Sequence, residues 1–245
     1  MRNVLVKSLK ELKLSFGAVG VKAEFESEGA TFEEVKILKQ IADDAKLDFV
    51  LKIGGCEALR DLKDAKLLGI KTIVAPMIES EYAFSKFIQG AKKVLREDAN
   101  LWINIETPQG ISALDAILRN ENAEFLSGVV FGRTDFSNAA HVADVNNQEV
   151  SRIIIDVCEK MLQSGKKFVV GGGITPQSVN LLKGFGELNG VETRKILFDF
   201  SVMSEKAISK ALEFEMNWLE YKRQFSPDAC DDERLQVLKN RCLTK

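Results

Sequence analysis

Two carboxylates follow short apolar segments in the middle of the chain. Glu106 comes directly after Leu101–Ile105, and Asp135 follows Leu126–Phe131 after a Gly-Arg-Thr step. Apolar runs of this length, bounded by turn residues, are typical of buried strands. If the two strands end side by side, the acids meet at one edge and offer hard oxygen ligands that suit Mg²⁺ or Mn²⁺. The other interpretation is that both acids only lead into loops.

Polar side chains at alternate positions occur in two of the expected strands. Asn104 shares a strand face with Glu106, and Lys22, Glu24 and Glu26 share one near the start of the chain. A solvated edge strand would explain the second group. The interior of a barrel mouth would explain it as well, and there these side chains would be functional.

The apolar pattern alternates between the period of strands and that of helices. Strands are expected at Val19–Phe25, Phe49–Ile53, Thr72–Ala75, Leu101–Ile105, Leu126–Phe131, Phe168–Val170 and Lys195–Phe200. Helices are expected at Thr31–Lys46 with Thr31 as N-cap, at about Glu57–Leu68, after Glu79 and at Ser204–Gln224, with a further short helix in the tail. Residues 1–15 are expected to add a short strand and a helical turn.

This alternation, with a period of about 25 to 30 residues, predicts one α/β domain over residues 1–245, a TIM-type (β/α)₈ barrel of parallel strands. An open doubly wound sheet is the competing architecture. Polar and glycine-rich features follow strands along the whole chain rather than at one switch point, which favours the barrel. Residues 204–245 form a C-terminal helical extension, which either mediates a homo-oligomer or is a solvated tail.

Composition excludes several classes of protein. The 245 residues are 45% hydrophobic and carry a formal net charge of -2, which gives no reason to expect nucleic acid or a membrane as partner. Four scattered cysteines and the absence of an apolar secretory segment at the start predict a reduced, cytoplasmic protein. The chain has a single histidine, so a zinc site of the usual Cys/His kind is not expected. This histidine, His141, lies in a polar stretch and is expected in a solvated loop.

The glycine run Gly171, Gly172 and Gly173 follows an expected strand and precedes Ile174-Thr175. Backbone amides in such a loop can hold a phosphate or a carboxylate, or the run can be only a tight turn. Arg194 stands at the start of the last expected strand. We expect it at the rim opposite to the chemistry, in a structural ion pair.

Three motifs, PMIE at 76–79, INIET at 103–107 and GRTDFS at 132–137, resemble the HpcH/HpaI aldolase and citrate-lyase β-subunit family of the phosphoenolpyruvate/pyruvate barrels. The similarity extends from about Val21 to Phe200. In that family the corresponding acids hold Mg²⁺ or Mn²⁺, which chelates pyruvate. The resemblance therefore implies Glu106 and Asp135 as metal ligands and Asn104, in place of a family glutamine, as a substrate contact.

The resemblance implies a class II aldolase or lyase that makes or breaks a C–C bond beside a pyruvate-type 2-oxo acid, through an enolate stabilised by the divalent ion. Lys52 stands where the family has an arginine, and we expect it to stabilise the developing charge. The family's acid–histidine pair aligns with Glu26-Ser27, so proton transfer falls to Glu26, Glu24 or a metal-bound water. Lys22, Thr134 and the glycine run are expected to contact substrate.

Two other functions are compatible with the same residues. A phosphosugar lyase or isomerase would use the glycine run for its phosphate. A barrel that binds oxo acids without turnover would agree with the missing histidine.

Overall fold

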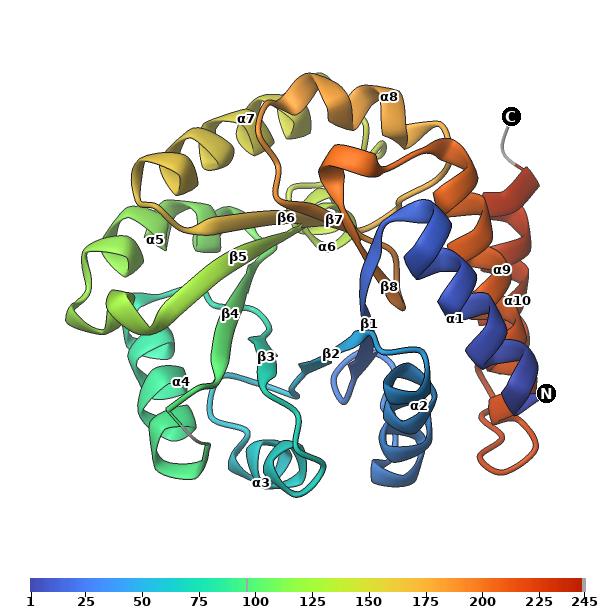
Figure 1. Cartoon of the computed structure of the whole chain (residues 1–245). Helices are drawn as coiled ribbons and strands as arrows, with labels where there is room; N and C mark the ends of the chain where they lie inside the picture. Colours follow the sequence, from blue (N-terminus) through green and yellow to red (C-terminus); the bar gives the residue numbers. More distant parts are fainter. Residues whose placement is uncertain (96, 244–245) are drawn as a thin grey trace.

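The computed structural model describes residues 1–95 and 97–243, which form a closed barrel of eight strands with helices packed around it (Figure 1). The strands are β1 (Ala18–Glu24), β2 (Asp48–Lys52), β3 (Thr72–Ala75), β4 (Asn100–Ile105), β5 (Leu126–Gly132), β6 (Lys167–Gly171), β7 (Gly190–Glu192) and β8 (Ile196–Asp199). The helices are α1 (Arg2–Phe16), α2 (Phe32–Asp44), α3 (Leu59–Leu67), α4 (Glu81–Val94), α5 (Pro108–Arg119), α6 (Arg133–Ala139), α7 (Gln148–Gln163), α8 (Ser178–Leu182), α9 (Glu205–Lys222) and α10 (Asp231–Leu243). Three 3₁₀ helices are η1 (Glu121–Phe125), η2 (Lys183–Phe185) and η3 (Phe200–Val202).

The expected barrel is confirmed, and the strands neighbour one another in chain order from β1 to β8. The expectation that all strands are parallel is wrong for the last one. β8 runs antiparallel to both β7 and β1. Only residues 193–195 connect β7 to β8, whereas a parallel pair needs a crossover of about a dozen residues or more. The two strands therefore form a hairpin, closed by a 2.9 Å hydrogen bond from Thr193 N–H to the Ile196 carbonyl.

The first segment of the chain is a helix, not the expected short strand. Leu5, Leu9 and Leu12 of α1 recur at helical spacing and are fully buried. The eighth strand is supplied instead by β7, in which Val191 is the one apolar side chain, so that it lacks the apolar run typical of a buried strand.

Capping residues fix where the helices next to the barrel mouth begin. The predicted N-cap Thr31 is confirmed: its hydroxyl accepts the Glu34 N–H at 3.3 Å, and the Glu34 carboxylate accepts the Thr31 N–H at 2.7 Å. Thr107, directly after Glu106, caps α5 by accepting the Gly110 N–H at 3.1 Å. Pro108 follows at the first helical position, which it suits because it needs no backbone donor there.

The lower part of the barrel interior is apolar. Val50, Val74, Val130 and Val169 form a cluster there, with Trp102 packed against it. Gly128 makes room for the indole, since a Cβ on Gly128 would lie 2.4 Å from the Trp102 ring. Along the same strands, toward their carboxyl ends, the interior side chains become polar.

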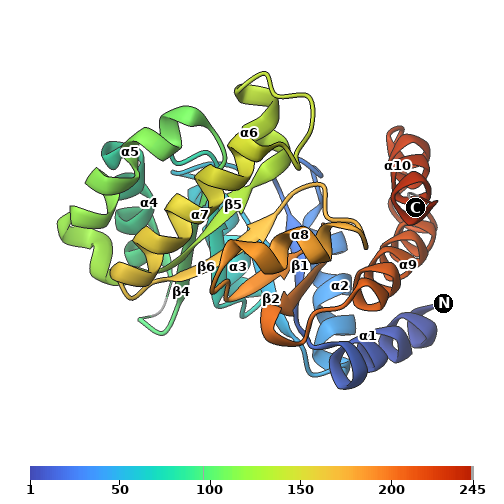
Figure 2. The ribbon, with the colours of Figure 1, turned by 90° about the horizontal axis from the view of Figure 1, so that it is seen from above.

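Helices α1, α9 and α10 lie together on one side of the barrel, and α1 and α10 both pack against α9 (Figures 1 and 2). Asp231, in the first turn of α10, is 3.0 Å from Lys222 Nζ at the end of α9. The predicted C-terminal helices are thus present as α9 and α10, and residues 244–245 of that prediction lie outside the described residues. Within the part of the chain that the structure describes, none of the helices has both the length and the apolar character needed to cross a membrane.

Candidate active site at the barrel mouth

A cavity of about 180 Å³ opens at the carboxyl ends of the strands. The side chains and glycines predicted from the sequence to act there all line it. They are Lys22, Glu24, Glu26, Lys52, Asn104, Glu106, Thr134, Asp135, Gly171, Gly172 and Gly173. The alternate positions on β1 therefore face the barrel interior, not solvent at a sheet edge. His141 is exposed in a turn after α6 and is not among the lining residues.

Glu106 is held at the end of β4 by three donors. The Met77 N–H donates to Oε1 at 3.0 Å, the Asn104 amide donates to Oε2 at 2.8 Å, and Lys52 Nζ lies 3.5 Å from Oε2. The residue is 2% exposed. Burial raises the pKa of Glu106, and the donors from Lys52, Asn104 and Met77 only partly oppose it, while Asp135 adds to the rise. A cation bound beside this carboxylate would relieve that cost.

Lys52 is a buried ammonium between two acids. Its Nζ lies 3.0 Å from Glu26 Oε2, besides the contact with Glu106. Burial alone would lower the pKa of Lys52, but the charges of Glu106 and Glu24 outweigh it and raise the pKa above the ordinary value. Lys52 is therefore a fixed cation at neutral pH.

Asp135 lines the same cavity, shortly after the strand β5 that neighbours β4. It lies in the first turn of α6 and is exposed, and its charge acts on Glu106. The Oδ1 atom of Asn104 is buried without a hydrogen-bond partner among the described residues. Two carboxylates and one amide oxygen are hard donors, and Mg²⁺ is usually held by one or two carboxylates together with water and substrate. The donor set fits Mg²⁺ or Mn²⁺, although no group of three His, Cys, Asp or Glu side chains suited to a metal occurs in the described chain.

A second ionic group fills the mouth beside β1. Lys22 Nζ lies 2.9 Å from Glu24 and forms a hydrogen-bonded ion pair with Glu192 of β7. Burial would raise the pKa of Glu24, but Lys22 and Lys52 outweigh it and hold that pKa far below its usual range. Sequence reasoning missed Glu192. The signal was present, because Val191-Glu192-Thr193 repeats the apolar-Glu-Thr pattern of Ile105-Glu106-Thr107.

The glycine run brings the end of β6 against the start of α6. Gly172 has a φ of +81°, and a Cβ there would lie 2.6 Å from the Thr134 backbone nitrogen. Arg133, which is fully buried, donates from Nε to the Gly172 carbonyl at 3.0 Å. These contacts are enough to explain why position 172 is a glycine, and a bound phosphate is not needed to explain it.

The expectation that Arg194 lies at the opposite rim is wrong. Because β8 is antiparallel, its start lies at the carboxyl rim, and Arg194 lines the mouth. The expected ion pair is present as a 3.9 Å contact with Glu28. Arg241 of α10 also lines the mouth. No sequence signal pointed to Arg241, because its position depends on how α10 packs.

Comparison with known proteins gives a structural likeness. No family model matches the chain, and no curated protein matches it in sequence. An HpcH/HpaI aldolase/citrate lyase family protein from Burkholderia cenocepacia J2315 matches with a TM-score of 0.61 at 15% identity, covering 89% of this chain and 90% of the other. An HpcH/HpaI aldolase from Desulfitobacterium hafniense DCB-2 matches with a TM-score of 0.63 at 12% identity, over 92% and 90% of the chains.

The fold is that of the HpcH/HpaI aldolases. The citrate synthase SbnG has it too, with a TM-score of 0.61 at 14% identity and 90% of each chain covered. The HpcH/HpaI-type barrel is therefore shown by the arrangement of the backbone, at an identity too low to carry an activity across.

Proposed function

We propose that this protein is an aldolase or lyase of the HpcH/HpaI type, which makes or breaks a C–C bond beside the carbonyl of a pyruvate-type 2-oxo acid. The observation that carries the proposal is that Glu106 and Asp135 line one cavity, with the Lys52 ammonium 3.5 Å from Glu106. Two acids and a fixed cation around a small cavity suit a reaction in which negative charge develops on a carbonyl oxygen. The HpcH/HpaI-type fold agrees with this chemistry.

Glu106 and Asp135 would hold Mg²⁺ or Mn²⁺, which supplies Lewis-acid stabilisation of the substrate's keto oxygen when bound. Asn104, which lines the cavity, orients the Glu106 carboxylate through its 2.8 Å hydrogen bond, and its own Oδ1 has no hydrogen-bond partner among the described residues. Lys52 adds a second positive charge beside the same oxygen.

Glu26 is the group that we assign to proton transfer. It takes a proton from the methyl carbon, the C–H electron pair becomes the C=C bond of the enolate, and the carbonyl π electrons move to the oxygen. Glu26 Oε2 lies 3.0 Å from Lys52 Nζ, and the side chain is 28% exposed and lines the mouth. Glu24 is a poorer base, because Lys22 and the Ser27 hydroxyl at 2.6 Å already bind its carboxylate.

Lys52 is not assigned as a Schiff-base nucleophile. A nucleophilic amine must be neutral, whereas the acids around Lys52 raise its pKa despite burial. This supports metal-dependent chemistry over the amine-dependent route.

Exchange of the pyruvate methyl protons with D₂O, followed by NMR in the presence of Mn²⁺ or Mg²⁺, tests the enolising step. We expect exchange that EDTA abolishes and that Glu106→Gln lowers by at least about a hundredfold. The matched control is Glu121→Gln, which removes an exposed acid in η1 and should exchange as the native protein does. Metal-linked pyruvate binding without exchange would contradict the proposal in favour of a barrel that only binds oxo acids, and metal-independent binding of sugar phosphates would favour the phosphosugar alternative.

A further inference from the structure

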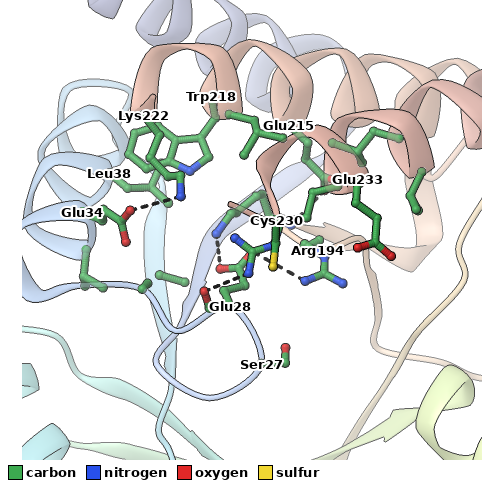
Figure 3. A pocket seen from close by; sticks show the side chains of 18 of the residues that line it. Ser27, Glu28, Glu34, Leu38, Arg194, Glu215, Trp218, Lys222, Cys230 and Glu233 are labelled. Atoms are coloured by element: carbon green, nitrogen blue, oxygen red, sulfur yellow. Dashed lines mark hydrogen bonds and ion pairs between the residues drawn. The ribbon is translucent and has the colours of Figure 1, made fainter. Parts of the chain in front are cut away.

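A second and larger cavity lies beside the mouth, between the barrel and the C-terminal helices (Figure 3). Its volume is about 350 Å³. Residues of α2, α9 and α10 form most of its wall, and the turn between β7 and β8 closes it toward the mouth. We call it the helical cavity. Arg194 and Arg241 line both cavities, whereas Glu106 and Asp135 do not line this one.

One wall of the helical cavity is apolar. It is formed by Trp218 and Leu219 of α9, Val35 and Leu38 of α2 and Leu238 of α10, all of them buried. Their packing leaves space between three helices that meet on this side of the barrel. A hydrocarbon chain placed there would be removed from water, which is favourable in proportion to the apolar area buried.

Most charged groups around the helical cavity are satisfied by the chain itself. Glu28 pairs with Lys195, and a dashed line in Figure 3 marks the pair between Glu34 and Lys222. Glu34 lies 3.3 Å from Lys222, and Arg234 lies 3.0 Å from Asp228. The remaining acid on the α10 side, Glu233, is exposed to solvent.

Two polar groups at the inner end lack such partners. Glu215 is 2% exposed, and its Oε1 accepts the Lys195 N–H at 2.8 Å, but its Oε2 is buried with no hydrogen-bond partner among the described residues. Among the described residues, no hydrogen bond and no ion pair within 4.0 Å is found for the Arg241 guanidinium, although the charge of Glu215 acts on it. A buried polar group without a partner is costly, so a ligand that satisfies it gains affinity.

Burial raises the pKa of Glu215, more than the Thr193 hydroxyl, the Lys195 N–H and the nearby arginines lower it. The Arg241 guanidinium has several N–H groups, and it is a donor that lacks an acceptor in the helical cavity. A carboxylate is the small group that accepts two parallel hydrogen bonds from an arginine fork.

We propose that the helical cavity binds a monocarboxylate with an apolar chain, its carboxylate on Arg241 and its chain against Trp218 and Leu38. The site lies next to the mouth and shares Arg194 and Arg241 with it. It does not depend on the proposed function, because it uses neither Glu106, Asp135 nor a metal.

Calorimetric titration of the full chain with octanoate, in EDTA, tests this site. We expect saturable binding of one octanoate, and binding of acetate that is at least about tenfold weaker because it lacks the chain. Tryptophan fluorescence should change on binding, and the change should be lost in Trp218→Phe, which leaves Trp102 as the remaining tryptophan.

Variants locate the binding. Arg241→Met should weaken octanoate at least about tenfold by removing charge-assisted hydrogen bonds, whereas Arg152→Met, on the exposed face of α7, should not. Val237→Asp, at a lining residue that is 43% exposed, should weaken it by charge repulsion without disturbing the core. Lys52→Met should leave it unchanged, because Lys52 lines only the mouth.

The proposal is overturned if octanoate does not bind, if acetate binds as tightly, or if Arg241→Met and Val237→Asp both bind octanoate like the native protein. Loss of octanoate binding in Lys52→Met alone would place the ligand in the mouth and overturn it as well. A failure of metal-dependent pyruvate exchange would leave these outcomes unchanged, so the two proposals fail separately.

Discussion

The ammonium nitrogen of Lys52 lies 3.5 Å from a carboxylate oxygen of Glu106, inside the mouth of the barrel. β3 stands between the strands that carry them, so the contact crosses the barrel interior rather than joining neighbouring strands. Both residues are at most 5% exposed. In so dry a setting a cation is effective at stabilising nearby negative charge, since little water screens it.

Removing the Lys52 charge should slow enolisation. Lys52→Met is expected to lower the rate of metal-dependent pyruvate methyl exchange by roughly 10²–10³-fold, the usual effect of deleting one electrostatic stabiliser. Lys52→Arg should keep part of the rate because it keeps the charge. Lys183→Met, at an exposed lysine, is the control. An exchange rate in Lys52→Met equal to the native rate would exclude the assigned role.

Replacing either acid of the mouth should weaken the binding of Mn²⁺, whereas replacing an exposed acid elsewhere should not. Glu106→Gln and Asp135→Asn are each expected to weaken Mn²⁺ binding at least about tenfold, as loss of a charged oxygen ligand does. Electron paramagnetic resonance of free Mn²⁺ measures this without reference to activity. Asp156→Asn, on the exposed face of α7, should bind like the native chain. Unaltered binding in both mouth variants would contradict the assignment of ligands.

Lys22 should be essential to stability. Lys22→Met leaves the carboxylates of Glu24 and Glu192 buried without their counter-ion, which typically costs about 3–5 kcal/mol. Urea unfolding measures the loss. Adding Glu192→Gln to Lys22→Met should recover part of it, whereas Lys36→Met, at an exposed ion pair on α2, should cost less than about 0.5 kcal/mol. A loss as small in Lys22→Met as in the control would show that the buried pairs contribute little.

Glu215 should make stability fall as pH rises from the acid range. Burial raises the pKa of Glu215 above its value of about 4.3 in an unfolded chain. Between the two pKa values the folded state binds more protons than the unfolded state, so the stability gained at low pH is lost as pH rises through the folded pKa. Glu215→Gln removes this effect. The free energy of unfolding of this variant should therefore increase relative to that of the native chain from about pH 4 upward. Glu220→Gln, an exposed acid on the same helix, should track the native chain; a Glu215→Gln difference that does not vary with pH would contradict the burial effect.

A comparison of two glycines distinguishes the stability cost of backbone strain from the cost of steric contact. Gly172 and Gly69 both have positive φ, +81° and +67°, but only at Gly172 would a Cβ meet other atoms within 4 Å. Gly69→Ala should cost roughly 1–2 kcal/mol for the left-handed backbone. Gly172→Ala should cost about 1–3 kcal/mol more, because β6 and α6 must move apart. Thermal or urea unfolding compares the two, and equal losses would mean that the approach of β6 to α6 adds nothing.

Much of the barrel is readable from local patterns. Each of the seven expected strands overlaps an observed strand, because apolar runs of three to seven residues between turn residues carry their own signal. Thr31 is found at its predicted cap because its hydrogen bonds join residues only three positions apart. β7 and the hairpin to β8 were not predicted, because Val191 is the one apolar side chain of β7 and the direction of β8 depends on pairing with β1, which is far away in the chain.

By itself, the sequence determined the residue types at the mouth: Glu106 directly after one strand, Asp135 shortly after another, and a β1 face bearing Lys22 and Glu24. That Lys22 and Glu24 share one face follows from the strand period of two residues, which is a local property. Only the tertiary structure decided that Glu192 pairs with Lys22, and that Arg194 and Arg241 reach the mouth. Those contacts join residues far apart in the chain, and they depend on the closure of the sheet and on the packing of α10, which no short window of sequence encodes.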